Sequence, residues 1–362
     1  MYVAWRDLKF AKGRFALMGT VVVLITLLVG LLSGLTAGLG RQNISAITGL
    51  PAGQIAFTAP SGGQALSYSG STVTEKQWRQ WAGAPGVLSA EPLGITTTKA
   101  AAGDRSTAVS AFGVRPGSAL APDSGKLAGQ SVVLSTTAAD DLGVTTGAAV
   151  TVAGQRMTVA AVAGDASFSH TPVIWTSLDA WRSTVPPSGT GDRPAATVIA
   201  LNTAAGADLA ATDRAAGTRT VTKDDSLSAI GSYTSENGSL QLMRGFLFAI
   251  SALVIGAFFT VWTIQRSGDI AVLKALGATT AGLLKDALGQ AVVLLTGGTL
   301  AGTGLAAGLG AVLSGSAVPF VLTPATVLVP AAVMILLGVL GAALSVRRIT
   351  AVDPLTALGS AR

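Results

Sequence analysis

The sequence predicts an α-helical membrane protein with four transmembrane helices and an extracellular α/β domain inserted between helices 1 and 2. Four long apolar segments, a single polar interruption and the placement of charge support this fold class. The spans are predicted at residues 15–40, 239–264, 284–313 and 326–346. Each is long enough to cross a bilayer, which requires about 20 mostly apolar residues. Residues 41–238 then form the insert.

The amino-acid composition and the missing motifs exclude several classes of function. Hydrophobic residues make up 49% and charged residues 12% of the chain, whereas ordinary soluble domains are about 25% charged. There is no Cys and only one His, so neither a Cys-based metal site nor a His pair exists. The phosphate-binding pattern Gly-x-x-x-x-Gly-Lys-Ser/Thr is absent. We therefore expect no catalytic residues, no protein-bound metal and no cofactor of the chain's own.

Charge placement predicts the topology. The net charge of +6 arises from basic residues at both ends of the chain and in the loop between the second and third spans. By the positive-inside rule these parts face the cytoplasm, so the insert and the short loop 314–325 lie outside. The pI of 9.9 then indicates contact with anionic inner-leaflet lipid and not with nucleic acid. The basic residues concerned are Arg6, Lys9, Lys12, Arg14, Arg266, Lys274, Lys285, Arg347, Arg348 and Arg362.

The chain begins with a predicted amphipathic helix at residues 1–14, lying on the cytoplasmic face of the membrane. A cleaved signal peptide is the alternative for the first apolar segment. Signal peptides usually have an apolar core of about 7–15 residues, and this one is longer. A retained span at 15–40 is the preferred interpretation. At the other end, residues 347–362 are predicted to be a cytoplasmic tail.

The insert is predicted to mix short helices with β-strands. Thr74 is a suitable N-cap for a helix at Val73–Ala82. We expect a porter-like subdomain at 43–130 and 195–238, and a β-rich subdomain at 131–190, with a Pro/Gly-rich loop at 185–194 between them. Further short helices are expected at Thr136–Leu142 and Ser177–Ser183. Strands are predicted at Gly94–Lys99, Ala108–Val114, Ser131–Ser135, Ala148–Val152, Met157–Ala163, Pro172–Thr176 and Thr197–Leu201.

The cytoplasmic loop at 265–280 reads as a short amphipathic helix. Ser267 is a suitable cap, Asp269 stands in the first turn and Gly277 is a stop signal. Its apolar face could dock in a partner's groove or rest on lipid.

Two motifs carry a family resemblance. RSGDIAVLKALGA, at 266–278, resembles the coupling helix of MacB/FtsX-type ABC transporter permeases, with Asp269 where Glu is common. RRITAVDPLTAL, at 347–358, is similar to the ending of the same family, and residues 132–176 are similar to its external β-rich subdomain. The resemblance implies ATPase contacts by Arg266, Asp269, Ile270, Leu273, Lys274, Leu276 and Gly277.

The resemblance also implies partners and a location. These permeases pair with cytoplasmic ABC ATPase subunits, which bind ATP-Mg, and a second copy of the permease gives a 2+2 complex. They work by mechanotransmission between the ATPase and the external domain. A bacterial cytoplasmic membrane location follows, with both termini in the cytoplasm and the large domain outside.

The opening stretch Val3–Gly19 resembles haem-exporter permeases of the HrtB type, which implies haem as cargo. Glu236 or Tyr233 could then coordinate iron. Arg244 or Arg41 could pair with a propionate, and Met243 is a further candidate. The alternative for this cluster is ordinary anchoring at the membrane interface.

His170 is interpreted as a surface-loop residue rather than as a ligand. Gly30, Gly34 and Gly38 lie on one face of the first span and could pack within the chain or against a second copy. Two other functions remain open: an FtsX-like regulator of a cell-wall hydrolase that transports nothing, and an extruder of lipids, peptides or drugs.

Overall fold

The chain divides into two compact units. The computed structural model describes residues 12–185, 194–265, 276–313 and 318–350, together with Gly268 and Val272. Residues 39–238 form one unit, called here the external unit. Residues 1–38 and 239–362 form the other, called the membrane unit. Residues 1–11 of the predicted amphipathic helix and the tail after Thr350 lie outside the described residues.

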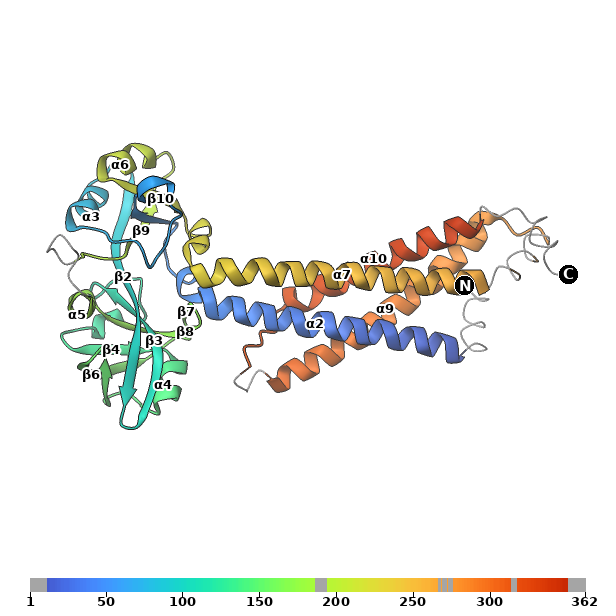
Figure 1. The fold of residues 1–362 in the computed structure, drawn as a ribbon, viewed down its shortest axis with the longest axis horizontal. Coiled ribbons are helices and arrows are strands. Elements are labelled where there is room, and N and C mark those ends of the chain that lie inside the picture. The colour runs from blue at the N-terminus through green and yellow to red at the C-terminus, as the bar shows by residue number, and fades with distance from the viewer. Residues whose placement is uncertain are drawn as a thin grey trace. The chain divides into compact units, whose positions relative to one another are not determined.

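Four long helices carry the apolar segments (Figure 1): α2 (Lys12–Thr48), α7 (Gly231–Gln265), α9 (Thr280–Leu313) and α10 (Pro324–Thr350). Within the described residues, four helices are long and apolar enough to cross a membrane. α2 continues beyond the predicted limit at residue 40, and α7 begins before residue 239. Residues 41–48 and 231–238 contain no proline, so nothing in the backbone stops the helix where the polar sequence starts. Helical backbone therefore extends from the membrane unit into the external unit at both ends of the insert.

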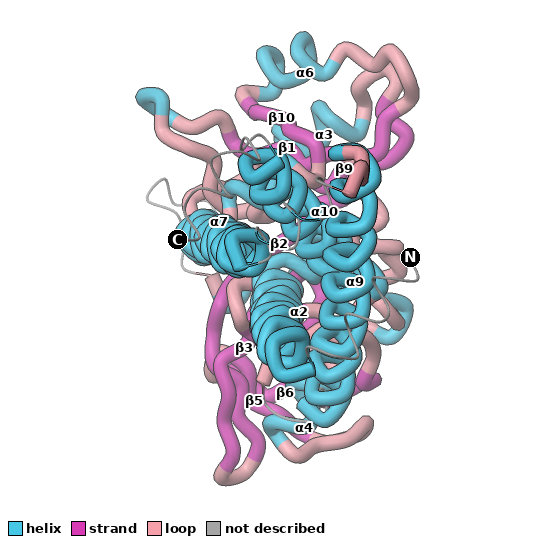
Figure 2. Tube along the Cα trace, turned by 90° about the vertical axis from the view of Figure 1, so that its right-hand side faces the viewer, coloured by secondary structure: helices cyan, strands magenta, loops and turns pink. Residues whose placement is uncertain are grey.

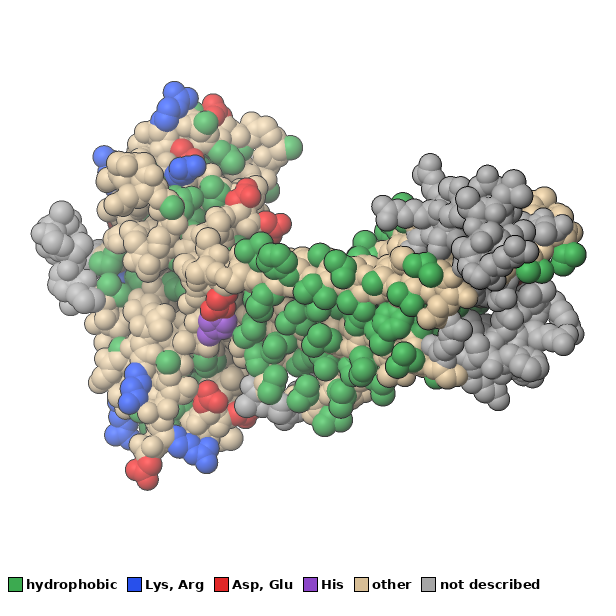
Figure 3. Space-filling view, turned by 45° about the vertical axis from the view of Figure 1, so that its right-hand side comes forward, with side chains coloured by type: hydrophobic (Ala, Val, Ile, Leu, Met, Phe, Trp, Pro, Cys, Tyr) green, Lys and Arg blue, Asp and Glu red, His purple; other side chains and the backbone are tan. Residues whose placement is uncertain are grey.

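The glycine face of α2 packs within the chain. A Cβ atom on Gly30 would lie 2.8 Å from the Cβ of Ala306, and one on Gly34 would lie 2.3 Å from the Phe320 ring. At Gly38 it would lie 1.9 Å from the carbonyl oxygen of Pro319. The glycines therefore admit α9 and the segment before α10 against α2. Large apolar side chains remain exposed over the four helices (Figure 3), including Leu242, Phe246, Ile250 and Leu253 of α7.

The external unit is built on a ten-stranded sheet in the order β10-β1-β9-β2-β3-β8-β4-β6-β5, with β7 paired to β8. Figure 2 shows β1, β9 and β10 together, and β5 and β6 together. The strands are β1 (Gln54–Thr58), β2 (Val87–Ala102), β3 (Arg105–Val114), β4 (Ser131–Leu134), β5 (Ala149–Val152), β6 (Gln155–Val162), β7 (Ser167–Phe168), β8 (Thr171–Ser177), β9 (Val198–Thr203) and β10 (Thr218–Thr222).

The sheet does not divide at residue 131, where the sequence placed a subdomain boundary. β2 pairs with β9 through its first half and with β3 through its second. β3 in turn runs parallel to β8. The predicted strands at 94–99 and 108–114 thus belong with the β-rich part. Pairings of this kind join distant segments, and local periodicity carries no information about them.

The external unit contains short helices that begin at N-capping residues. α3 (Glu75–Ala82) has Thr74 as its N-cap, with a capping box completed by Gln77. α4 (Thr136–Leu142), α5 (Leu178–Thr184) and α6 (Leu209–Ala216) are likewise short and capped. Of the predicted loop 185–194, residues 186–193 lie outside the described residues.

An aromatic chain forms the centre of the main core in the external unit. Phe57, Tyr68, Phe168, Phe112 and Trp175 follow one another in edge-to-face contacts, with ring centroids 4.9–5.6 Å apart. Burial raises the pKa of the Tyr68 hydroxyl above its usual range, and its hydrogen bond to a serine opposes this only in part. Phe168 is the last residue of β7, so the turn that follows it starts from a fixed point in the core.

Candidate functional site

The turn between β7 and β8 has an unusual backbone. Its two residues, Ser169 and His170, have φ angles of 50° and 64°, and Phe168 pairs with Thr171 across it. Positive φ at both central residues is the type I′ pattern, which normally uses Asn or Gly. A residue with a Cβ atom loses about 1–2 kcal/mol in this region. Ser169 and His170 adopt this conformation in spite of its free-energy cost, which indicates a role for their side chains.

Three hydrogen bonds join β7 and the turn to the end of α2. The backbone N–H of Ser169 donates to the carbonyl of Asn43 at 3.0 Å, and that of His170 donates to the carbonyl of Gln42 at 3.2 Å. The N–H of Ser167 donates to the hydroxyl of Ser45 at 2.8 Å. Together with the buried Phe168, these bonds fix where the His170 side chain starts.

Five side chains meet at this place, and we call them the junction cluster: Asn43, Ser169, His170, Ser232 and Glu236. His170 Nε2 lies 2.8 Å from Glu236 Oε2 and 2.9 Å from Oε1. The Asn43 Nδ2 donates to Glu236 Oε2 at 3.1 Å, while its Oδ1 accepts from Ser232 Oγ at 2.5 Å. Ser169 Oγ and Ser232 Oγ are 2.8 Å apart. All five belong to the external unit.

The contacts assign a proton to His170 Nε2. That nitrogen also lies 2.9 Å from Asn43 Nδ2, which is a donor. An unprotonated Nε2 would face the carboxylate of Glu236 as acceptor against acceptor. With a proton on Nε2 the ring donates to Glu236, and the Asn43 amide supplies its own hydrogen to the same carboxylate. Glu236 thus accepts two hydrogen bonds from α2 and the β7–β8 turn.

The structure therefore gives His170 a contact that the sequence interpretation as a surface-loop residue did not include. The side chain is 30% exposed, but it is also bonded to Glu236. The partners are 66 residues apart in the chain. The only local signal was a Ser-His pair at a two-residue turn between strands, where Asn-Gly is usual.

The other predicted cargo residues have different surroundings. Tyr233 is partly buried and packs against the aromatic core. Arg41 makes a loose ion pair with Asp165 at 3.8 Å, and both side chains are more than half exposed. Met243 and Arg244 belong to the membrane unit, where Met243 is exposed and the Nε of Arg244 is buried without a hydrogen-bond partner in the described residues. Of the five predicted cargo residues, Glu236 is the one that belongs to the junction cluster.

The predicted ATPase-contacting segment is described only in part. Arg266, Asp269, Ile270, Leu273 and Lys274 lie outside the described residues.

The end of this segment is visible. The N–H of Leu276 donates to the carbonyl of Val272 at 3.0 Å, which is a helical hydrogen bond. Gly277 follows with a φ of 93°, a backbone conformation suited to ending a helix. The side chain of Leu276 is 79% exposed, so an apolar residue faces outward at this point.

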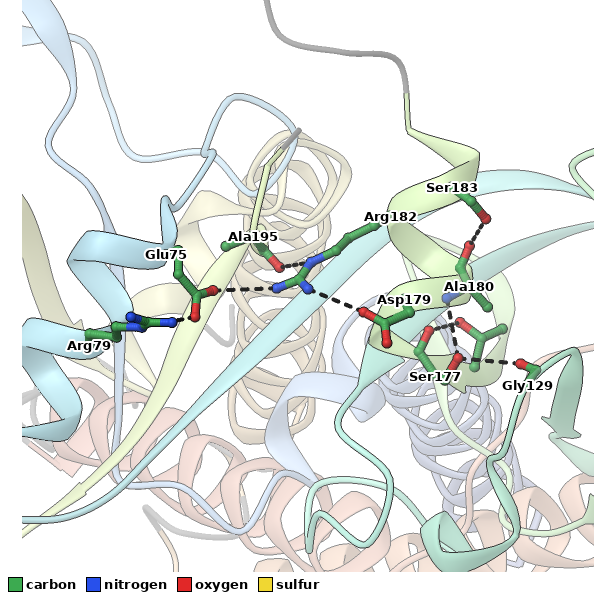
Figure 4. Close-up of polar contacts among 10 residues, drawn as sticks. Glu75, Arg79, Gly129, Ser177, Asp179, Ala180, Arg182, Ser183 and Ala195 are labelled. Carbon is green, nitrogen blue, oxygen red and sulfur yellow. Dashed lines mark hydrogen bonds and ion pairs between the residues drawn. The ribbon is translucent and has the colours of Figure 1, made fainter. Parts of the chain in front are cut away.

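A second feature of the external unit is a polar cleft of about 540 Å³ beside α3 and α5. Arg182 reaches from α5 to Glu75 of α3 at 3.7 Å and to Asp179 at 3.2 Å (Figure 4). Arg115 on its wall pairs with Glu91 through two hydrogen bonds. The charged groups of the cleft thus neutralise one another, and we interpret them as links between α3, α5 and the sheet.

The junction cluster is not a site for a bare metal ion. Within the described residues no three His, Cys, Asp or Glu side chains gather as metal ligands. Haem has a smaller requirement, because the porphyrin supplies four nitrogen ligands and the protein needs to add only one axial ligand. A half-exposed carboxylate such as Glu236 meets that requirement chemically.

Comparison with protein families gives two matches that together cover most of the chain. Residues 15–219 match the MacB-like periplasmic core domain. Residues 242–354 match the FtsX-like permease C-terminal region. The chain belongs to the MacB/FtsX family of ABC transporter permeases. It is a multi-pass membrane protein whose α/β domain, between the first and second long helices, is extracytoplasmic. The family lacks a nucleotide-binding domain, so an ATPase partner supplies ATP hydrolysis.

Several relatives match over their full length. The chain is 26% identical over 370 residues to "Putative hemin transport system permease protein HrtB" of Staphylococcus epidermidis, covering 99% of both chains. The protein with the same printed name from Staphylococcus haemolyticus is 27% identical over 373 residues, again covering 99% of both. "Uncharacterized ABC transporter permease Rv2563" of Mycobacterium tuberculosis is 25% identical over 377 residues, with the same coverage.

Solved structures of external domains are also similar to part of the chain. The extracellular domain of the noncanonic ABC-type transporter YknZ from Gram-positive bacteria matches with a TM-score of 0.35 and 16% identity, covering 47% of this chain and 98% of that one. The periplasmic region of MacB from Actinobacillus actinomycetemcomitans matches with a TM-score of 0.33 and 15% identity, covering 50% and 94%.

Asn43→Ala should destabilise the external unit. The side chain is 2% exposed and bonds to Ser232 and Glu236, so its removal takes away two internal hydrogen bonds, each worth about 0.5–1.5 kcal/mol. Thermal unfolding of the detergent-solubilised protein, with hydrogen exchange of residues 167–171, measures the effect. Gln42→Ala, one residue earlier on α2, is the control. Equal stability and exchange in both variants would contradict the role given to Asn43.

Proposed function

We propose that this chain is the permease subunit of an ATP-driven exporter that removes haem from the cytoplasmic membrane. The observation that carries the proposal is the carboxylate of Glu236, which is 41% exposed and is oriented by hydrogen bonds from His170 and Asn43. It stands near the start of α7, in a chain that is similar along its whole length to permeases named for hemin transport. A carboxylate is an acceptable axial ligand for ferric iron, and a nearby cation suits the propionates.

Arg41 is the cation that the external unit offers. It lies two residues before Asn43 on α2, and its ion pair with Asp165 is long and solvent-exposed. Such pairs contribute little to stability, typically about 0–1 kcal/mol. Arg41 could therefore exchange Asp165 for a propionate at small cost. Tyr233, one helical turn before Glu236 on α7, offers a second oxygen ligand in the same region.

The driving force enters through the cytoplasmic loop between α7 and α9. We propose that the helix ending at Gly277 is the coupling helix that docks on the ATPase, with Leu276 part of the apolar contact. A second copy of the chain would complete a 2+2 complex. In this scheme, closure of the ATPase subunits moves the coupling helices, and α2 and α7 pass the movement to the external domain.

Leu276→Asp should prevent association with the ATPase. The substitution places a charge on an exposed apolar side chain, so the fold is not expected to change, but a docked apolar contact would lose its burial. Co-purification with the tagged ATPase subunit measures association. Leu88→Asp is the matched control, because Leu88 of the external unit is 72% exposed. Retained co-purification of Leu276→Asp would contradict the docking assignment.

Glu236→Gln should weaken hemin binding at least tenfold, because the amide replaces an anionic ligand of ferric iron with a neutral one. The Soret band of hemin titrated into the full-length permease with its ATPase measures this, and hemin stimulation of ATP hydrolysis should fall in parallel. Glu75→Gln is the control, since Glu75 is 43% exposed.

The same titration separates the other functions of the family. A wild-type complex that neither binds hemin nor responds to it would contradict haem export. ATPase stimulation by lipids, peptides or drugs instead would indicate an extruder of another cargo. Stimulation by none of these, combined with binding of a cell-wall hydrolase to the external domain, would indicate an FtsX-like regulator.

A further inference from the structure

We infer that His170 is a positioning residue for this haem site, which holds Glu236 by one carboxylate oxygen and leaves the other to ligate the iron. The inference rests on the proposed function, because it gives a role to a residue that acts through Glu236. Three observations on the junction cluster support it: the uneven bonding of the two carboxylate oxygens, the backbone conformation of His170, and the difference in exposure across the cluster.

The two oxygens of Glu236 are not equivalent. Oε2 accepts from His170 Nε2 at 2.8 Å and from Asn43 Nδ2 at 3.1 Å. Oε1 has only the longer contact with His170 Nε2, at 2.9 Å. The single proton on Nε2 serves one oxygen well, and the Asn43 amide adds to the same oxygen. Oε1 therefore keeps the free lone pairs that a metal centre requires.

The backbone of His170 is held in a conformation that a glycine would adopt more easily. Its φ of 64° costs a non-glycine residue free energy that the fold must offset elsewhere. A glycine would satisfy the turn and make the same N–H bond to Gln42. The imidazole is the part of His170 that glycine lacks, and its hydrogen bond is to the Glu236 carboxylate.

The side chains of the junction cluster differ in their solvent exposure. Asn43 is buried on the α2 side, whereas Glu236 is 41% exposed and His170 is 30% exposed. A ligand approaching from solvent or lipid thus reaches the carboxylate without displacing Asn43. The buried amide fixes the inner oxygen, and the imidazole fixes the rotation of the carboxylate.

This arrangement suits a cargo that must be bound and released. A hydrogen-bonded carboxylate is oriented before the metal arrives, so less conformational freedom is lost on ligation. The oxygen that faces outward is therefore held in one geometry for the iron.

His170→Gly tests the inference without endangering the fold, because glycine relieves the positive φ. We expect the dissociation constant for hemin to rise about ten- to a hundredfold, as is usual when a hydrogen-bond partner of a metal ligand is removed. The probe is hemin, titrated into the full-length permease with its ATPase. His170→Gln, which retains an N–H donor, should recover most of the affinity.

Ala153→Gly is the matched control. It relaxes another positive-φ residue, with a φ of 48°, in the turn between β5 and β6, and it lies outside the junction cluster. We expect hemin affinity close to wild type. A readout without hemin is the infrared carboxylate band of Glu236, identified by its loss in Glu236→Gln. That band should shift in His170→Gly and stay unchanged in Ala153→Gly.

The outcomes separate the inference from the proposed function. If Glu236→Gln loses hemin while His170→Gly keeps both wild-type affinity and the wild-type infrared band, the role of His170 is overturned and haem binding by Glu236 stands. If Glu236→Gln binds hemin as well as wild type does, the ligand assignment fails, and the inference fails with it. Weak hemin binding in His170→Gly, with rescue by Gln and none of the effect in Ala153→Gly, supports the inference.

Discussion

The carboxamide of Asn43 joins three elements that are distant in the sequence. Its amide nitrogen contacts His170 on the β7–β8 turn and Glu236 on α7, and its oxygen accepts from Ser232. Because the side chain is 2% exposed, each of these bonds must be made within the protein. The buried amide holds Glu236 and Ser232 of α7 beside α2. Separate bonds, from backbone N–H groups to the carbonyls of Gln42 and Asn43 and to the Ser45 hydroxyl, attach β7 and the turn to α2.

This cluster gives a physical basis for transmitting movement. α2 and α7 are continuous helices whose polar ends lie in the external unit, and the β7–β8 turn is bonded to both of them. In the proposed scheme, a shift of either helix would act on the turn and, through Phe168, on the aromatic core. The same bonds hold the proposed haem ligand, so cargo binding and helix movement would act on shared contacts. Glycines on α2 admit neighbouring segments closely.

Local signals in the sequence predicted the elements that depend on nearby residues. The four apolar segments, the Thr74 cap and the strands β4, β5, β6, β8 and β9 follow from composition, capping and periodicity, whereas the two-residue strand β7 does not. The helices α2 and α7 extend beyond the predicted spans, because hydropathy marks the apolar segment and not the whole helix. β1 was missed, since its five residues carry no alternation and gain their place through pairing with β9 and β10.

The contacts of the candidate site cannot be predicted from local sequence. The residue type of Glu236 and its place near a span predict a role for it, but nothing in the neighbouring sequence indicates its partners. Asn43 and Glu236 are 193 residues apart, and Asn43 and His170 are 127 apart. A lone histidine in a Ser-His-Thr-Pro stretch has no periodicity or motif to connect it with a helix start. Only the pairing of β8 with β3 and β4, which sets the turn beside α2, brings the imidazole to the carboxylate.

The central claim is that Glu236, held by the junction cluster, ligates haem iron through oxygen. Electron paramagnetic resonance of ferric hemin bound to the full-length permease, with protein in excess, tests it directly. With Glu236 as the ligand, the spectrum is that of an oxygen-ligated haem and changes in Glu236→Gln. A spectrum typical of imidazole ligation, unchanged in Glu236→Gln and lost in His170→Gly, would show instead that the histidine is the ligand and would contradict this assignment.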